Sequence, residues 1–351
     1  KKEASRFIKN FLDLDVDAAN CIPTVGSMQG AFASFMICGH TNKEKDTVLF
    51  IDPGFPVHKF QTKILGLKME SFDIYEYRGE KLREKLESIF STGKIHSVLY
   101  SNPNNPTWVC LTDEELKIIG ELANKYDVII LEDLAYFGMD FRKDYSHPGV
   151  APFQPTVGKY TDNYILMLST SKAFSYAGER CAVLGISNKL AERRYPDLKE
   201  FCGQEIFARG IIFGALHPLS SGTSHSAQYA VAGVMKAVND GTYNYRDDVL
   251  EYGEKAKMMK DAFTSNGFKF TYDEDLGEPI ADGFYFTYYY PGFTGAELLE
   301  KMLYYGISAI SLDTCGSTRQ GIRACTSLIQ RDEIPVLAER LKRFAEDHPI
   351  K

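Results

Sequence analysis

Short runs of apolar residues alternate, over the first 190 positions, with segments whose apolar residues recur at helical spacing. Runs that are continuously apolar are typical of strands covered on both faces of a parallel sheet. The pattern predicts such strands at 47–51, 96–100, 128–131, 164–168 and 182–186. Each run stops at polar or turn-forming residues, so the polar side chains of this region gather at strand ends.

Helical patterns fill the intervals between these runs. Segment 80–90 is one predicted helix, and segment 116–126 is another. The second follows Thr112 and Glu115, which have the spacing of a capping box. Strands that alternate with helices predict an α/β fold, with a mostly parallel sheet and helices on both faces. Ligands of such sheets bind at the carboxyl ends of the strands, where the polar residues lie here.

The pattern changes after residue 244. A charged helical stretch at 246–263 precedes predicted strands at 268–272 and 283–288, and helices are expected at 295–305 and 332–346. Strands with intervening helices predict a smaller C-terminal α+β domain. The chain of 351 residues is longer than one compact core usually supports. We therefore expect a large domain over 1–244 and a small domain over 245–351.

The net charge and the cysteine content limit the possible binding partners and the cellular compartment. A net charge of −7 argues against nucleic acid as the main partner, because phosphate backbones need a basic surface. The seven cysteines are scattered and never spaced as C-x-x-C, which favours free thiols over disulfides or a metal site. The uncharged stretch 18–42 contains too many polar residues, glycine and proline for a membrane span. With no signal-peptide pattern, these features predict a cytoplasmic protein with no metal and no membrane partner.

Three strand-end features could carry chemistry, although each has an ordinary alternative. The small-residue turn at 25–30 opens a helical pattern and could cradle a phosphate, or it could be a plain glycine turn. Asp133 follows four apolar residues, and a buried acid there needs a cation or a strong donor. Lys172 follows three hydroxyl side chains after a predicted strand, but isolated lysines and arginines are usually solvated. Taken one at a time, these residues leave the function open.

In their order and separation, however, the motifs resemble the class I/II, aspartate-aminotransferase-like family of pyridoxal-phosphate enzymes. The resemblance lies in "NPNNPT" at 102–107, "EDLAY" at 132–136, "STSKAFSYAGER" at 169–180 and "GIR" at 321–323. It extends from about Glu3 to the C-terminus. It implies the fold type I architecture, pyridoxal 5'-phosphate as cofactor, and transfer of an amino group from an L-amino acid to a 2-oxo acid.

The resemblance also implies a role for each matching residue. Lys172 would form the internal aldimine with the cofactor and later shuttle a proton, and Asp133 would pair with the pyridinium nitrogen. Asn105 and Tyr136 would hydrogen-bond the phenolic oxygen. The phosphate would be held by Ser27, Met28, Ser169 and Arg180. The face of the cofactor ring would stack on Phe55, and the substrate carboxylate would bind to Arg323 with Asn105. His58 matches a position that can support the aspartate from behind.

Several positions depart from the family pattern. Trp108 stands where the family nearly always has glycine, and its ring could narrow the substrate pocket or only reshape the turn. Met28 lacks a polar side chain, so any phosphate contact there would come from the backbone. The chain starts inside a helix-like segment, so we expect that an N-terminal segment usual in the family is missing. Residues 220–223 lie where the family's partner subunit reaches the cofactor, which predicts a homodimer with shared active sites.

Two other functions remain compatible with these residues. A lyase on the same scaffold, such as a carbon–sulfur β-lyase or a decarboxylase, would begin from the same covalent chemistry. A non-catalytic regulatory domain is also conceivable, although Lys172 and Arg323 are both retained. The substrate side chain is not indicated, because no second arginine is assignable and the aromatic run 284–290 suits a core as well as a pocket.

Overall fold

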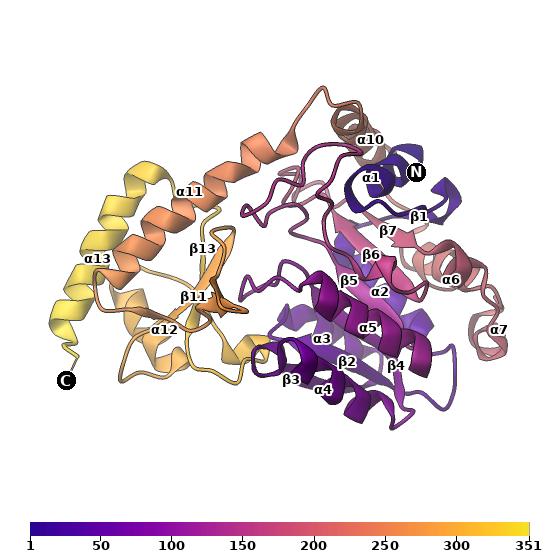
Figure 1. Ribbon diagram of the computed structural model, residues 1–351, viewed down its shortest axis with the longest axis horizontal. Helices are drawn as coiled ribbons and strands as arrows, with labels where there is room; N and C mark the ends of the chain where they lie inside the picture. The colour runs from indigo at the N-terminus through magenta and orange to yellow at the C-terminus, as the bar shows by residue number, and fades with distance from the viewer. Residues whose placement is uncertain (351) are drawn as a thin grey trace.

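The computed structural model describes residues 1–350 and contains a large seven-stranded sheet, a small four-stranded sheet and a two-stranded hairpin (Figure 1). The large sheet has seven strands, in the order β1 (Cys21–Thr24), β7 (Ala182–Ile186), β6 (Tyr164–Ser169), β5 (Ile129–Asp133), β4 (Ile95–Ser101), β2 (Thr47–Asp52) and β3 (Lys68–Asp73). The five strands from β6 to β3 are parallel, whereas β7 is antiparallel to both of its neighbours. The predicted mostly parallel sheet is therefore confirmed, with the run 182–186 as its exception.

Helices cover both faces of this sheet, as expected. One face packs against α1 (Lys2–Leu12), α4 (Glu80–Phe90), α5 (Asp113–Tyr126) and α10 (His225–Asn239). The other face packs mainly against α2 (Gly26–Cys38), α6 (Asn188–Glu192), α7 (Pro196–Cys202), α8 (Phe207–Arg209) and the helical turn Gly210–Leu216. Strand β2 shows why the runs are continuously apolar: Leu49 and Ile51 face the first core, and Val48 and Phe50 face the second.

Local signals in the sequence place two of these helices. The amphipathic spacing of α4 matches the predicted bounds 80–90. At the start of α5, Thr112 Oγ1 accepts a hydrogen bond from the Glu115 N–H at 3.2 Å, and Glu115 Oε2 accepts one from the Thr112 N–H at 3.0 Å. The predicted capping box is therefore present, and it satisfies N–H groups that have no partner inside the helix.

The small sheet is antiparallel, in the order β12 (Ile310–Ser311), β13 (Ile322–Cys325), β11 (Tyr285–Tyr289) and β8 (Lys269–Phe270). Its core includes residues of α11 (Tyr245–Thr264), α12 (Gly295–Tyr304) and α13 (Ile334–Asp347). The strand expected at 268–272 is only two residues long. A two-stranded hairpin of β9 (Glu274–Asp275) and β10 (Glu278–Pro279) and the short helices α3 (Pro56–Ile64) and α9 (His217–Ser220) complete the elements used below.

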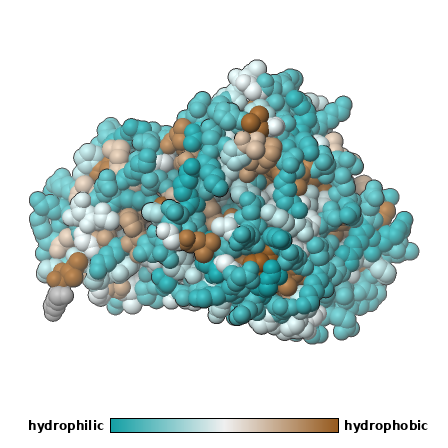
Figure 2. All heavy atoms as spheres, in the orientation of Figure 1, coloured by the Kyte–Doolittle hydropathy of each residue, from teal (hydrophilic) through white to brown (hydrophobic). Residues whose placement is uncertain are grey.

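Helix α11 joins the two parts of the molecule, and Figure 1 shows it running from the neighbourhood of α10 to the small sheet. Tyr245 and Val249, in its first half, pack into the core of the large sheet, while Met259 and Phe263 pack into the small core. The domain division after residue 244 stays a prediction. The face of the molecule in Figure 2 is mostly hydrophilic, with separate apolar patches.

Neither a membrane-spanning helix nor a cluster of metal-ligating side chains is present in residues 1–350. None of their helices is both long and apolar enough to cross a membrane. The same residues contain no group of three or more His, Cys, Asp and Glu side chains arranged to hold a metal ion.

Candidate active site

A pocket of about 240 Å³ lies at the carboxyl ends of β2, β4, β5 and β6. The strand register brings the carboxyl ends of neighbouring strands together at this edge of the sheet, since Ser101 at the end of β4 lies opposite Asp133 at the end of β5. The structure brings all ten predicted site residues to this pocket, namely Ser27, Met28, Phe55, Asn105, Asp133, Tyr136, Ser169, Lys172, Arg180 and Arg323. Arg323 comes from β13, so the small sheet contributes to the pocket as well.

Lys172 lies in the turn that follows β6. Thr170 fixes this turn, because its Oγ1 donates a 2.6 Å hydrogen bond to the carbonyl oxygen of Cys181. The Lys172 Nζ lies 4.6 Å from the centroid of the Phe284 ring. Burial lowers the pKa of Lys172, and the nearby guanidinium groups of Arg323 and Arg180 act in the same direction. The lowered pKa favours a neutral, nucleophilic amine.

Asp133 ends β5 with its carboxyl group buried in the pocket. Burial raises the pKa of this carboxyl group to about 7. Its Oδ1 accepts a 3.1 Å hydrogen bond from the Ala135 N–H, and no lysine, arginine or histidine among residues 1–350 forms an ion pair with it. A buried carboxylate without a cation is costly, so this position is suited to a positively charged ligand group.

The N-terminus of α2 and Arg180 form an anion cradle. No side chain caps α2, so the first N–H groups of the helix, around Ser27 and Met28, are available to a ligand. Gly26 has φ +68°, and a Cβ added there would lie 2.5 Å from Arg180 Nη2. The guanidinium therefore lies over the helix N-terminus, in space that only glycine leaves open. Ser169 is buried beside it at the end of β6.

Arg323 reaches across from the small sheet to the loop after β4. Its Nη1 donates a 2.8 Å hydrogen bond to Asn105 Oδ1, and its Nε is buried with no hydrogen-bond partner within the described chain. The centre of the guanidinium lies 4.1 Å from the centroid of the Tyr285 ring. Tyr136 in turn donates a 3.0 Å hydrogen bond from its hydroxyl to the Tyr285 hydroxyl.

The pocket also contains polar residues that were not predicted as site residues, among them Asp52, Lys59 and Tyr285. Asp52 ends β2 and forms a buried ion pair with Lys59. Burial raises the pKa of Asp52 to about 6, and Lys59 opposes this rise. Asp52, like Asp133, is an acid at the end of an apolar strand, and this pattern in the sequence could have indicated a site residue. Tyr285 had no comparable signal within its aromatic run.

Phe55 and His58 lie at the start of α3. Phe55 is about one-third exposed in the pocket wall, and its ring meets the His58 ring edge-on with centroids 5.6 Å apart. Burial lowers the pKa of His58 to about 4, so its imidazole is neutral. His58 Nδ1 is buried without a hydrogen-bond partner among residues 1–350. The Asp133 carboxyl group accepts its hydrogen bond there from the Ala135 N–H and none from His58, so the support from behind is not seen as a hydrogen bond.

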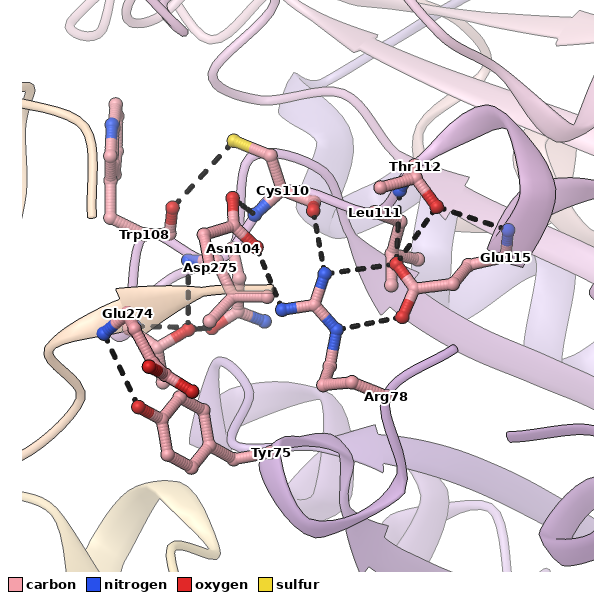
Figure 3. A network of polar contacts seen from close by, with 12 residues as sticks. Tyr75, Arg78, Asn104, Trp108, Cys110, Leu111, Thr112, Glu115, Glu274 and Asp275 are labelled. Carbon is pink, nitrogen blue, oxygen red and sulfur yellow. Dashed lines mark hydrogen bonds and ion pairs between the residues drawn. The ribbon is translucent and has the colours of Figure 1, made fainter. Parts of the chain in front are cut away.

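A buried polar network holds the loop that carries Asn105. Figure 3 shows Arg78 between two acids, with its Nε 2.7 Å from Glu115 Oε1 and its Nη1 2.7 Å from Asp275 Oδ1. Both acids also accept backbone N–H groups, and the Cys110 N–H donates to Asp275 Oδ2 at 3.2 Å. The loop is therefore tied both to α5 and to the hairpin of β9 and β10.

Trp108 occupies this loop with φ +65°, a left-handed conformation that glycine adopts most easily. Its side chain is fully buried and does not line the pocket. The indole packs so closely on Gly283 that no side chain would fit there, and it meets the Tyr136 ring edge-on with centroids 5.3 Å apart. Of the two expectations for Trp108, the structure favours a reshaped turn that supports the pocket from behind.

The segment expected to reach a partner subunit lies beside α2 in its own chain. Gln29 Nε2 donates a 2.8 Å hydrogen bond to Ser220 Oγ. Gln29 follows Ser27 and Met28, so Ser220 lies near the anion cradle. The contact of residues 220–223 with a second subunit stays a prediction.

The two sheets and the pocket between them have the aspartate aminotransferase-like fold. An aspartate aminotransferase structure from Thermotoga maritima matches with a TM-score of 0.75 at 17% identity, covering 98% of this chain and 81% of that one. The family model described as "Aminotransferase class I and II" matches residues 1–341. The chain therefore belongs to the class I and II aminotransferase family, whose members depend on pyridoxal phosphate.

The curated relatives align with this chain over only part of their own length. A probable aspartate aminotransferase of Methanocaldococcus jannaschii is 28% identical over 190 residues, which are 54% of this chain and 47% of the relative. A glutamate-pyruvate aminotransferase of Escherichia coli is 27% identical over 259 residues, 72% of this chain and 57% of the relative. The chain thus spans about half the length of the curated relatives that it matches.

Proposed function

We propose that this protein is an aminotransferase that uses pyridoxal 5'-phosphate to move an amino group from an L-amino acid to a 2-oxo acid. One observation carries the proposal: a half-buried lysine, a buried acid without a cation and an arginine with a free buried N–H meet in one pocket. These are Lys172, Asp133 and Arg323. Family membership supports the same reaction.

The residues present fit the cofactor at both of its charged ends. The uncapped N-terminus of α2, Arg180 and Ser169 would hold the phosphate, since together they offer N–H, guanidinium and hydroxyl donors to one anion. The buried Asp133 carboxyl would pair with a protonated ring nitrogen, which would supply the positive charge that it lacks. When bound, pyridoxal phosphate supplies an aldehyde that reacts with amines and a ring that withdraws electrons from the attached carbon.

Lys172 has the two properties that the reaction needs from a side chain. Because burial lowers its pKa, a larger fraction of its amine is neutral and can attack an aldehyde. Once free, the same Nζ can accept the proton of the substrate α-carbon as a general base. The wall formed by Phe284 and Tyr285 limits the access of water to this amine.

Arg323 and Asn105 would bind the substrate carboxylate. The planar guanidinium offers two parallel N–H donors, which match the two oxygens of a carboxylate. Asn105 holds one end of the guanidinium and leaves the buried Nε available. Every α-amino acid and 2-oxo acid carries this carboxylate, so both substrates can use the same site in turn.

We further propose a homodimer with shared active sites and a cytoplasmic location. The position of Ser220 beside the anion cradle supports the first, because a neighbouring subunit seated on this segment would lie close to the phosphate site. All seven cysteines are free thiols, which supports a reducing compartment. Sedimentation of the protein with cofactor tests the subunit number.

The reaction itself is tested by incubating the cofactor-loaded protein with a panel of L-amino acids and 2-oxoglutarate. An aminotransferase forms glutamate and the matching 2-oxo acid in equal amounts. A β-lyase or decarboxylase would instead release pyruvate with ammonia, or carbon dioxide, without needing 2-oxoglutarate. A binding domain would convert none of the amino acids, and that result would contradict the proposal.

The central residue has its own test. Lys172→Ala should abolish the visible absorbance of the lysine-bound cofactor and the covalent product that borohydride fixes, because the other amine of the pocket, on Lys59, is held in an ion pair with the buried Asp52. Lys257→Ala, at an exposed position on α11, is the matched control and should retain both signals. Retention of both signals in Lys172→Ala would remove the basis of the proposal.

A further inference from the structure

The small sheet presents Tyr285 and Arg323 to the pocket as diagonal neighbours. The register pairs Tyr285 of β11 with Cys325 of β13, and Thr287 with Arg323. Side chains two positions apart on a strand point to the same face, and diagonal neighbours are within reach of aromatic and long side chains. The guanidinium centre accordingly lies 4.1 Å from the Tyr285 ring centroid, so the cation lies over the face of the ring.

The guanidinium has few other partners. Its Nη1 donates to Asn105 Oδ1 at 2.8 Å, its Nε is buried without a partner, and no carboxylate in residues 1–350 forms an ion pair with Arg323. An arginine has five N–H donors in a fixed plane. One hydrogen bond leaves that plane free to rotate about the bonded edge, so the covering ring determines its orientation.

Tyr285 is itself held in place from the large sheet. Its hydroxyl accepts the 3.0 Å hydrogen bond from Tyr136, just beyond the end of β5. Its ring packs edge-on against Tyr136 at 5.3 Å and against Trp108 at 6.1 Å between centroids. Tyr285 is 5% exposed, so neither contact competes with much solvent. The ring that faces Arg323 is therefore a fixed surface.

We propose that Tyr285 is a positioning residue for the substrate carboxylate: its ring holds the Arg323 guanidinium in the orientation that presents the free Nε to a carboxylate oxygen. The inference rests on the proposed function and adds to it the residue that orients Arg323. A cation over an aromatic ring is stabilised enough to change affinity by roughly tenfold when solvent is excluded. The hydroxyl does not touch the guanidinium, and edge-on packing against Tyr136 and Trp108 holds the ring without it, so phenylalanine should replace tyrosine in this contact.

Carboxylate binding can be measured without turnover. Propionate has a carboxylate but no amino group, so it can occupy the Arg323 site without reacting. An anion bound beside Lys172 should shift the pH titration of the absorbance of the lysine-bound cofactor, and the shift reports propionate affinity. The variants are Tyr285→Leu and Tyr285→Met, which lack the ring, and Tyr285→Phe, which keeps it. Tyr304→Leu, at a tyrosine that is 78% exposed on α12, is the matched control.

The two ring-free variants should bind propionate about tenfold more weakly than the natural protein, while Tyr285→Phe and Tyr304→Leu stay within about threefold. With an amino acid that serves as donor, the ring-free variants should raise KM about tenfold and change kcat by less than about threefold. Tyr285→Met fills the site with a flexible apolar chain, so it serves if the leucine variant fails to fold.

Unchanged propionate affinity in the ring-free variants would overturn the inference. So would an equal loss in Tyr285→Phe, because the hydroxyl rather than the ring would then be responsible, and so would a natural protein that does not bind propionate. These outcomes are distinct from failure of the proposed function, in which no amino acid is converted while propionate binding still depends on Tyr285.

Discussion

Replacement of Asp133 by asparagine tests whether the buried carboxylate destabilises the protein until a positively charged ligand group binds beside it. The substitution keeps the shape of the side chain and an acceptor for the Ala135 N–H, but it removes the charge. Burial raises the pKa of Asp133 from an ordinary value of 3.8 to about 7. In the folded, cofactor-free protein this carboxyl group therefore binds a proton more tightly than it does in the unfolded chain.

The sign of the effect on stability follows from this difference. Between about pH 4 and pH 7 the folded state binds more protons than the unfolded state, so the free energy of unfolding falls as the pH rises. A shift of about three pKa units corresponds to about 4 kcal/mol at pH 8, with the full loss reached above the folded pKa. Cofactor-free Asp133→Asn should be more stable than the natural protein at pH 8 by up to about this amount, and no more stable at pH 4.

Thermal unfolding of both proteins at pH 4 and pH 8, with and without pyridoxal phosphate, is the measurement. Cofactor should stabilise the natural protein more than the variant at pH 8, because a protonated ring nitrogen would offset the buried charge only in the former. If the natural protein without cofactor is as stable as the variant at pH 8, Asp133 does not carry an uncompensated charge. The ring-nitrogen assignment would then lose its physical support.

Substitutions at two backbone-constrained positions, Gly26 and Trp108, provide further tests. Gly26→Ala should weaken pyridoxal phosphate binding more than tenfold in an absorbance titration, because the new Cβ displaces Arg180. Gly66→Ala controls for backbone strain, since Gly66 has φ +69° and a Cβ added there would have no atom within 4 Å. Equal cofactor affinity in the two variants would refute the anion cradle. Trp108→Ala should lower the free energy of unfolding in urea by about 3–5 kcal/mol, and Trp108→Gly by about 1 kcal/mol less, because glycine relieves the strain at φ +65°. A larger loss in the glycine variant would contradict this.

Central elements of the large sheet could be predicted because their surroundings are uniform. Strands β2, β4, β5 and β6 have apolar residues on both faces, and each falls within two residues of its expected bounds. Strands β1 and β3 were not predicted. Strand β3 is an edge strand whose first four residues are exposed, so it lacks the apolar run, and β1 has only four residues, of which one is Pro23.

The small sheet was harder to predict because tertiary contacts shorten its strands. The strand expected at 268–272 ends at Phe270. Tyr272 lies beyond the strand, and its hydroxyl donates a 2.6 Å hydrogen bond to Asp73 Oδ2 at the end of β3. Such a contact joins residues 199 positions apart, and no local pattern contains it.

The sequence by itself determined the α/β class, most central strands, the capping box of α5 and the residue types of the site. It could do so because apolar periodicity and short motifs act over a few residues. Only the tertiary structure decided that Arg323 reaches Asn105, that Arg180 lies over Gly26, and that Tyr285 joins Arg323 to Tyr136. These contacts depend on how the small sheet packs against the strand ends of the large one, and that packing is the sum of many distant contacts rather than a property of any segment.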